Sequence, residues 1–183
     1  MKKHLLVALV GTALILPFAA QAEGAYIGAS VGRAESELDT NGRSLKDRDT
    51  GYKLNAGFDF TKNFGVEVGY GDFGKPSISG SGITVSAKPR SYYLAGTVTY
   101  PFDEQFSVFA KAGVTRNRTK VSATGSGSTK YRNTDAILGV GAAYNVAKNM
   151  AVVIEYDNVG KTIDEPGISL KSDMVSIGLR YKF

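Results

Sequence analysis

The stretch from Gly51 to Tyr70, GYKLNAGFDFTKNFGVEVGY, decides the fold. In its first half every second residue is apolar, and the residues between them are Lys, Asn, Gly and Asp. The same alternation resumes after a polar turn at residues 61–63. A period of two residues is typical of strands and not of helices. The stretch therefore predicts a β-hairpin whose two arms each have one apolar and one polar face.

The N-terminus has the pattern of a secretory signal peptide. Lys2 and Lys3 precede an apolar run over residues 5–20, and the sequence Ala20-Gln21-Ala22 has the small-x-small pattern of a cleavage site. We therefore expect residues 1–22 to be removed and residues 23–183 to form one domain, since about 160 residues fit a single domain.

Composition excludes several classes of protein. The chain has no Cys, which excludes a disulfide scaffold and lipid attachment at a Cys. Two of the 22 Lys and Arg residues lie in the predicted signal, which leaves 20 basic against 17 acidic side chains. An excess this small does not indicate a nucleic-acid partner.

Alternation of the same kind marks six further strands. They are residues 25–33, 92–100, 106–114, 138–146, 150–156 and 173–183. Tight turns alternate with long polar connections, which we predict to be loops over residues 35–50, 74–90, 116–132 and 161–172. Eight antiparallel strands need closure to remove their edges, and eight is about the number whose interior side chains can fill the barrel.

A predicted hairpin over residues 138–156 repeats the one over residues 51–70. Tyr70 matches Tyr156, and Gly74-Lys75 matches Gly160-Lys161, at a constant offset of 86 residues. The repeat covers one supersecondary unit and does not indicate a solenoid.

Alternation alone does not decide whether the apolar face points into a core or toward lipid. A soluble periplasmic barrel of the lipocalin type would have the apolar face inside. However, the polar face mixes Gly, Ser and Ala with charges, as a narrow lumen requires, and the aromatic residues of the apolar face lie near strand ends, as in membrane barrels. We therefore predict an all-β protein, an eight-stranded antiparallel up-and-down transmembrane β-barrel.

Several segments, in this order and spacing, resemble the OmpA/OmpX-type outer-membrane barrels. They are AYIGASVGR, FGVEVGY, YPFDEQFSVFAKAG, IEYDNVG and the terminal MVSIGLRYKF. The resemblance covers essentially the whole mature chain and implies a Gram-negative outer membrane, periplasmic short turns and long connections outside the cell. Tyr181 and Phe183 look like the C-terminal signal that the barrel-assembly machinery reads. We expect a barrel alone, without the periplasmic C-terminal domain of OmpA.

The sequence contains few of the residue types that enzymes use for catalysis. The single histidine is His4, in the predicted signal, and there is no Cys. This excludes Ser-His dyads, Cys nucleophiles and ordinary zinc sites, and leaves a carboxylate pair or a Ser-Lys dyad. We predict a protein that is not an enzyme and has no cofactor or metal.

Charged residues on the polar face form the first candidate site. Several of these charged residues lie at similar numbers of residues from the short turns, so we expect them at similar heights in the lumen. The predicted network is Lys53, Glu67, Lys111, Glu155 and Arg180. Charges buried in a narrow barrel must be paired. The network is either a structural plug or a gate in which Glu67 exchanges partners. The resemblance supports the gate only in part, because the basic positions opposite this glutamate in OmpA-type barrels correspond to Thr97 and Val153.

Basic residues of the second and third predicted loops form the other candidate site. They are Lys75, Lys88, Arg90, Arg116, Arg118, Lys120, Lys130 and Arg132. Such a patch would favour contact with lipopolysaccharide, whose phosphates lie in the outer leaflet, or with anionic host surface ligands; the alternative is a set of solvated loops.

Together these patterns predict an integral outer-membrane protein that supports envelope integrity and presents loops for adhesion or other surface interactions. The alternative function is a narrow gated pore for ions or small solutes. A general porin channel would need about 16 strands.

Overall fold

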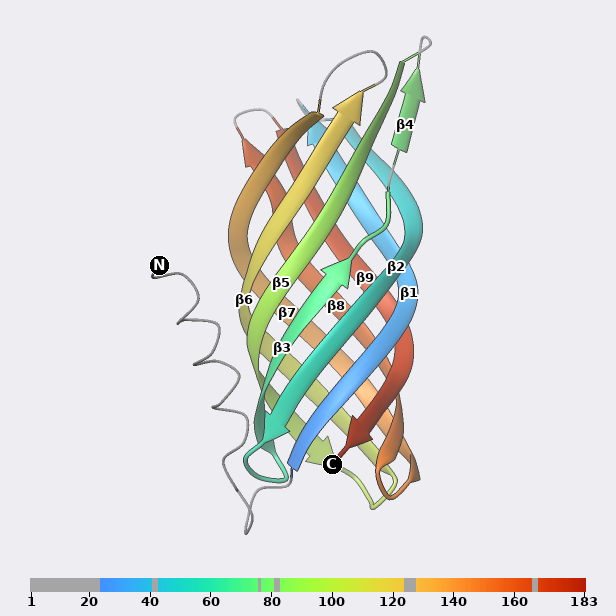
Figure 1. Ribbon diagram of the computed structural model, residues 1–183, viewed down its shortest axis with the longest axis vertical. Coiled ribbons are helices and arrows are strands. Elements are labelled where there is room, and N and C mark those ends of the chain that lie inside the picture. The colour runs from blue at the N-terminus through green and yellow to red at the C-terminus, as the bar shows by residue number, and fades with distance from the viewer. Residues whose placement is uncertain (1–23, 41–42, 76, 81–82, 124–127, 166–167) are drawn as a thin grey trace, which may run out of the picture.

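The computed structural model describes residues 24–40, 43–75, 77–80, 83–123, 128–165 and 168–183. The predicted signal peptide lies outside these residues. They form nine strands: β1 (Gly24–Thr40), β2 (Arg43–Asp59), β3 (Phe64–Asp72), β4 (Ser77–Gly80), β5 (Ile83–Pro101), β6 (Phe106–Ala123), β7 (Ser128–Ala147), β8 (Met150–Glu165) and β9 (Ile168–Lys182) (Figure 1). A search of this part of the chain finds no helix with the length and apolar character needed to cross a membrane.

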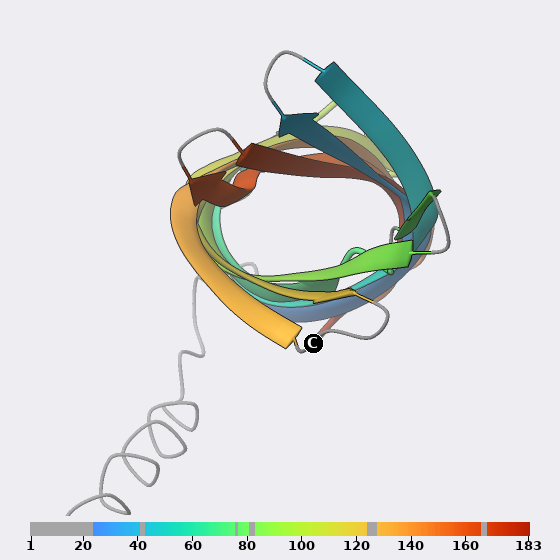
Figure 2. The same cartoon turned by 90° about the horizontal axis from the view of Figure 1, so that it is seen from above.

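The strands close into one antiparallel barrel. Their order in the sheet is β3-β2-β1-β9-β8-β7-β6-β5-β4, and β3 also pairs with β5, from Phe64 opposite Val98 to Asp72 opposite Arg90. This pairing completes the ring, which is visible from above in Figure 2. The short β4 pairs with β5 beyond the end of β3. Eight strands therefore form the barrel, and the predicted fold class is confirmed.

The apolar face of each strand points outward. Leu54, Val98 and Ile177 each expose more than half of their surface, whereas Lys53, the neighbour of Leu54, is buried. Exposed apolar side chains surround the half of the barrel that holds the short turns. Such a band suits hydrocarbon and not water, and the predicted orientation toward lipid is confirmed.

The prediction of four long loops is wrong. The strands of the barrel other than β3 are 15–20 residues long, whereas about 9–11 residues cross a bilayer. The β1–β2 ladder continues through Leu38 opposite Leu45 up to Thr40 opposite Arg43. Beyond the lipid both strand faces are polar, so the period of two disappears from the sequence although backbone pairing continues. The barrel therefore projects well outside the membrane.

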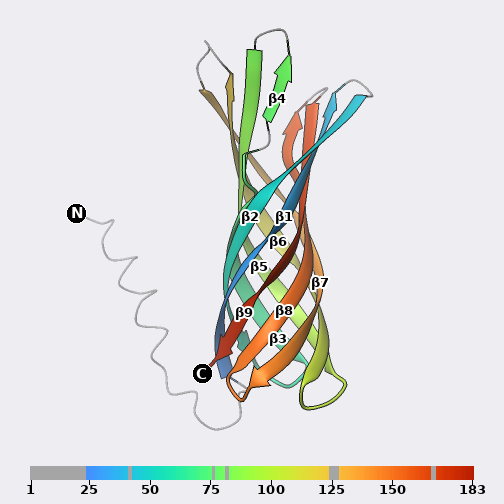
Figure 3. The same cartoon turned by 90° about the vertical axis from the view of Figure 1, so that its right-hand side faces the viewer.

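The projecting half divides into two sheets. The β2–β3 ladder ends at Tyr52 opposite Asp72, and the β7–β8 ladder ends at Leu138 opposite Asn158. Above these points the paired strands are β2-β1-β9-β8 on one side, here the mixed sheet, and β7-β6-β5-β4 on the other, the basic sheet (Figure 3). We call the two gaps between them the β2/β4 seam and the β7/β8 seam.

Candidate functional site

Glu67 on β3 lies at the centre of the lumen and is almost completely buried. One carboxylate oxygen accepts hydrogen bonds from the Tyr93 hydroxyl at 2.7 Å and from Lys111 Nζ at 3.1 Å. The other accepts bonds from the Tyr26 hydroxyl at 3.0 Å and from Asn55 Nδ2 at 2.8 Å. Both oxygens therefore have two donors, which offsets much of the desolvation of the charge.

Two lysines connect Glu67 to a second pair of carboxylates. Lys111 Nζ lies 2.5 Å from Glu155 and 2.8 Å from Asp157. Lys53 contacts Glu155 and lies 2.6 Å from Asp157. Because Lys111 touches Glu67 as well, the lysines bind all three acids into one buried group.

The structure places all five residues of the predicted lumen network within this group. Arg180 is its outermost member, with Nη2 3.7 Å from Glu67 and its guanidinium over the Tyr26 ring. The predicted network omitted Asp157, which alternation also places on the lumen face and which contacts both lysines, and it omitted the tyrosines that hydrogen-bond Glu67. We call Lys53, Glu67, Lys111, Glu155, Asp157 and Arg180 the charge cluster; it has three positive and three negative side chains.

Apart from Arg180, which is partly exposed toward the short turns, the charge cluster has apolar side chains on both sides along the lumen. On the side of the short turns lie Phe109, Ala143, Ala151 and Val153. On the side of the projecting half lie Ala34, Phe73, Tyr93, Ala95, Ile137, Val159 and Met174. Their burial excludes water and strengthens the electrostatic attraction within the cluster.

The basic residues predicted to lie on loops lie on strands instead, with one exception. Lys88 and Arg90 are on β5, Arg116, Arg118 and Lys120 on β6, and Lys130 and Arg132 on β7. All seven side chains are exposed on the outward side of the basic sheet. Lys75 lies apart, between β3 and β4. The seven strand residues are here called the basic face.

Like charges lie directly opposite one another on this face. Lys120 is paired in register with Lys88 and Lys130, and one row closer to the membrane Arg118 is paired with Arg90 and Arg132. Like charges in opposed cross-strand positions destabilise a sheet. An arrangement of this kind is stabilised by an anion that neutralises several cations together.

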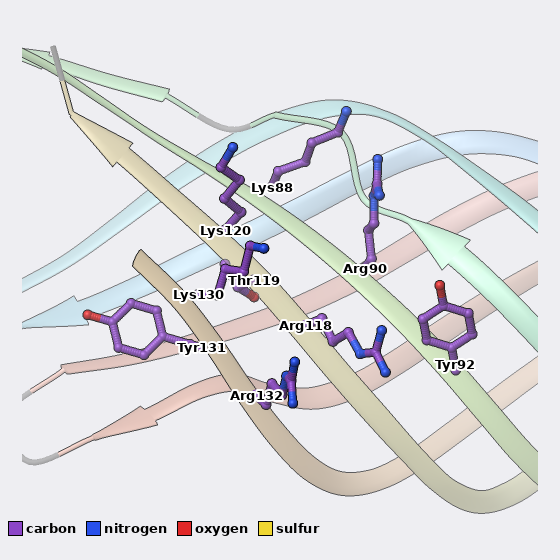
Figure 4. A pocket seen from close by; sticks show the side chains of 9 residues that line it. All are labelled: Lys88, Arg90, Tyr92, Arg118, Thr119, Lys120, Lys130, Tyr131 and Arg132. Carbon is purple, nitrogen blue, oxygen red and sulfur yellow. The ribbon is translucent and has the colours of Figure 1, made fainter. Parts of the chain in front are cut away.

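Few protein groups neutralise the basic face. Within the part of the chain that the structure describes, Arg90 alone of the seven forms an ion pair, with Asp72 at 3.0 Å. Arg118 lies over the Tyr92 ring at 5.5 Å. Six of the seven line an open hollow of about 480 Å³ (Figure 4). The hollow contains no acidic lining residue, so an anionic ligand fits its charge.

The mixed sheet differs because several of its outward cations pair with acidic side chains. Lys46 and Arg48 on β2 lie 3.2 and 2.7 Å from Glu35 on β1. Their hydrogen bonds hold the pKa of Glu35 below its usual value. The pKa of nearby Asp173 is raised, mainly because the carboxyl is partly buried and secondly because Glu35 repels its charge. The two sheets thus present a compensated surface on one side of the barrel and an uncompensated basic surface on the other.

The two residues of the predicted assembly signal lie where β9 ends near the short turns, with Phe183 directly after its last residue. Tyr181 and Phe183 are exposed on the lipid side, with ring centroids 5.2 Å apart. The backbone N–H of Phe183 donates to the carbonyl of Ala25 at 3.0 Å. Their recognition by the assembly machinery stays a prediction.

Comparisons with known proteins agree with this geometry. The profile of the family described as "Outer membrane protein beta-barrel domain" matches residues 5–183. Outer membrane protein A of Yersinia pseudotuberculosis is 27% identical over 98% of this chain and 54% of its own length. Outer membrane protein A of Serratia marcescens is also 27% identical, over 98% and 55%. The chain therefore spans about half the length of the curated relatives it matches.

Solved barrels have the same fold at lower identity. Neisserial surface protein A superposes with a TM-score of 0.60 at 23% identity, covering 90% of this chain and 100% of that protein. Ail of Yersinia pestis, crystallised with the heparin analogue sucrose octasulfate, superposes with a TM-score of 0.57 at 17% identity, covering 88% and 100%.

Proposed function

Because the chain belongs to the outer membrane protein β-barrel domain family, we propose that it is a non-enzymatic outer-membrane protein whose basic face binds phosphorylated lipid of the outer leaflet. By holding neighbouring lipopolysaccharide molecules it would support envelope integrity. The observation that carries this proposal is the opposed arrangement of cations without acids on β5, β6 and β7.

The height of the basic face favours a lipid ligand. On β5, Tyr92 is the next outward-facing residue after Arg90 in the direction of the membrane. The Tyr92 ring packs against Tyr70. Aromatic side chains of this kind mark the headgroup region of membrane barrels. The arginine row follows immediately beyond it, at the level expected for lipid phosphates.

Neutralising the arginine row tests this function. In the barrel refolded into nanodiscs, replacing Arg90, Arg118 and Arg132 by Gln is expected to weaken binding to immobilised lipopolysaccharide by roughly 100-fold. Each cation near an anionic surface contributes about 1 kcal/mol, and every 1.4 kcal/mol is about tenfold in affinity. Surface plasmon resonance at several salt concentrations gives the affinity and its dependence on ionic strength.

A matched variant removes three cations from the mixed sheet, by changing Arg33, Lys46 and Arg48 to Gln. It has the same net charge as the arginine-row variant, yet we expect less than a threefold loss. Equal losses in the two variants would show that only net charge matters and would overturn the assignment to the basic face.

Adhesion to anionic host surfaces is the second candidate function. It is favoured by the lysine row, which lies farther from the membrane than the arginine row, and by the sulfated sugar bound to the structurally similar Ail. Immobilised heparin provides the second arm of the same experiment. Loss of heparin binding together with lipopolysaccharide binding would indicate one anion-binding face for both ligands, whereas retention of heparin binding would assign the arginine row to lipid.

A narrow pore is a weaker candidate, because the charge cluster has apolar layers on both sides. We expect the refolded protein to show no steady conductance in planar bilayers. Glu67→Gln is expected to remain silent too, since Glu67 has four donors and its replacement does not remove the apolar layers. A steady conductance that Glu67→Gln changes would instead support the gate.

A further inference from the structure

The two seams of the projecting half are each bridged by an equivalent aspartate. Asp49 on β2 accepts a hydrogen bond from the backbone N–H of Lys75 at 2.6 Å, across the β2/β4 seam. Asp135 on β7 accepts one from the N–H of Lys161 at 2.7 Å, across the β7/β8 seam. Asp135 follows Asp49 by 86 residues, and Lys161 follows Lys75 by 86 residues, which is the offset of the repeated hairpins. The repeat therefore extends to the contacts that join the two sheets.

A glycine lies beneath each bridging carboxylate. Gly74 and Gly160 have φ angles of +77° and +64°, in the left-handed region that favours glycine. A Cβ on either glycine would approach the side chain of Asp49 or Asp135 to within 2.7 Å. At both seams the chain turns at a glycine so that the next backbone N–H faces the aspartate.

The β7/β8 seam has further connections. The Asn117 amide donates to the carbonyls of Val159 and Lys161 at 3.0 and 3.1 Å, and the Asn133 amide donates to Lys161 at 2.8 Å. Ile137 and Val159, from the two sides of this seam, belong to one buried apolar cluster, which also includes Phe73 beside the β2/β4 seam, so the two seams differ in their hydrogen bonds. Removing Asp135 would leave these contacts in place.

The hydrogen bonds across the β2/β4 seam go to acidic side chains. Besides Asp49, Asp47 accepts a hydrogen bond from the backbone N–H of Ser77 at 2.8 Å. Among the described residues, no amide side chain bridges this seam as Asn117 and Asn133 bridge the other. Asp47 and Asp49 are accessible to water, which competes for the same N–H groups.

We propose that the projecting half is a clamshell, in which the basic sheet turns about the β7/β8 seam and opens at the β2/β4 seam. Asp47 and Asp49 form its latch. The membrane half stays closed during this motion, because the β2–β3 and β3–β5 ladders continue below the seam. The device does not depend on anion binding by the basic face.

Distance measurements between introduced labels test the clamshell, and the absence of native Cys makes such labelling specific. Thr50→Cys with Ser77→Cys reports on the β2/β4 seam, and Thr134→Cys with Asp164→Cys reports on the β7/β8 seam. Spin-label distances would be measured by pulsed electron resonance in nanodiscs. Adding Asp47→Ala and Asp49→Ala is expected to lengthen and broaden the Thr50–Ser77 distribution by several ångströms and to leave the Thr134–Asp164 distribution unchanged.

The internal repeat supplies the matched control. Asp135→Ala removes the equivalent carboxylate, yet it is expected to leave both distributions narrow because Asn117 and Asn133 remain. The clamshell is wrong if the Asp47→Ala, Asp49→Ala variant keeps the parent distribution, or if Asp135→Ala opens its seam equally. Heat-modifiable gel mobility confirms a folded membrane half, and the single variant Asp49→Ala, which still removes one acceptor of the latch, replaces the double variant if that variant does not fold.

Discussion

Replacing Lys111 by methionine is expected to lower the free energy of unfolding by about 3–5 kcal/mol, the usual loss when one partner of a buried ion pair is removed. Lys111 lies 3.1 Å from Glu67, 2.5 Å from Glu155 and 2.8 Å from Asp157. Methionine fills a similar volume without charge, so three carboxylates would remain with two cations. Urea unfolding in lipid vesicles, followed by circular dichroism, measures the change.

Two further variants separate electrostatics from packing. Lys46→Met removes an ion-paired lysine that is more than half exposed, and we expect no measurable change in the free energy of unfolding. Adding Glu155→Gln to Lys111→Met restores the charge balance and is expected to recover part of the lost stability. A loss below 1 kcal/mol for Lys111→Met itself would mean that the charge cluster does not stabilise the barrel.

Replacing Gly69 by valine is expected to destabilise the barrel by about 3–5 kcal/mol, although valine is the better strand former. A Cβ at position 69 would lie 2.3 Å from the Tyr93 ring and 2.4 Å from its hydroxyl. The ring would have to move and give up its 2.7 Å hydrogen bond to Glu67. Overpacking typically costs about 1–3 kcal/mol, and a lost bond to a charged group about 1.5–3 kcal/mol.

Gly96→Val is the matched control for this change. Gly96 faces outward on β5, and a Cβ there would have its nearest neighbour at an ordinary contact distance of 3.9 Å. Because β-branched residues favour strands, we expect a neutral or slightly stabilising effect. If the two valine substitutions gave equal losses, the close approach of Tyr93 to Gly69 would not be the cause.

Sequence predicts the membrane half well and the projecting half poorly, for a physical reason. Between Gly51 and Tyr70 lipid lies on one side and the lumen on the other, so the two strand faces differ in composition. Beyond the bilayer water replaces lipid. Arg116, Arg118 and Lys120 are outward-facing strand residues, but the intervening Asn117 and Thr119 are polar too, and no contrast remains to indicate a strand.

The charge cluster was predictable in part. Counting from the short turns places Glu67, Lys111 and Glu155 at similar heights, because paired strands advance together. Tyr93 was missed, although its position next to the outward Tyr92 assigns it to the lumen. The contacts of Asp47 and Asp49 with backbone N–H groups could not be predicted, since the strand break that they bridge leaves no periodic signal.

The pairing of β1 with β9 has a consequence for the lifetime of the folded protein. It runs from Tyr26 opposite Lys182 to Thr40 opposite Ile168, and thus joins the two ends of the barrel sequence. Contacts between such distant residues make folding slow, because loop-closure entropy is lost before they form. Once this ladder has formed, unfolding must break many backbone bonds together. We therefore expect kinetic persistence, with spontaneous unfolding too slow to compete with protein turnover at the cell surface.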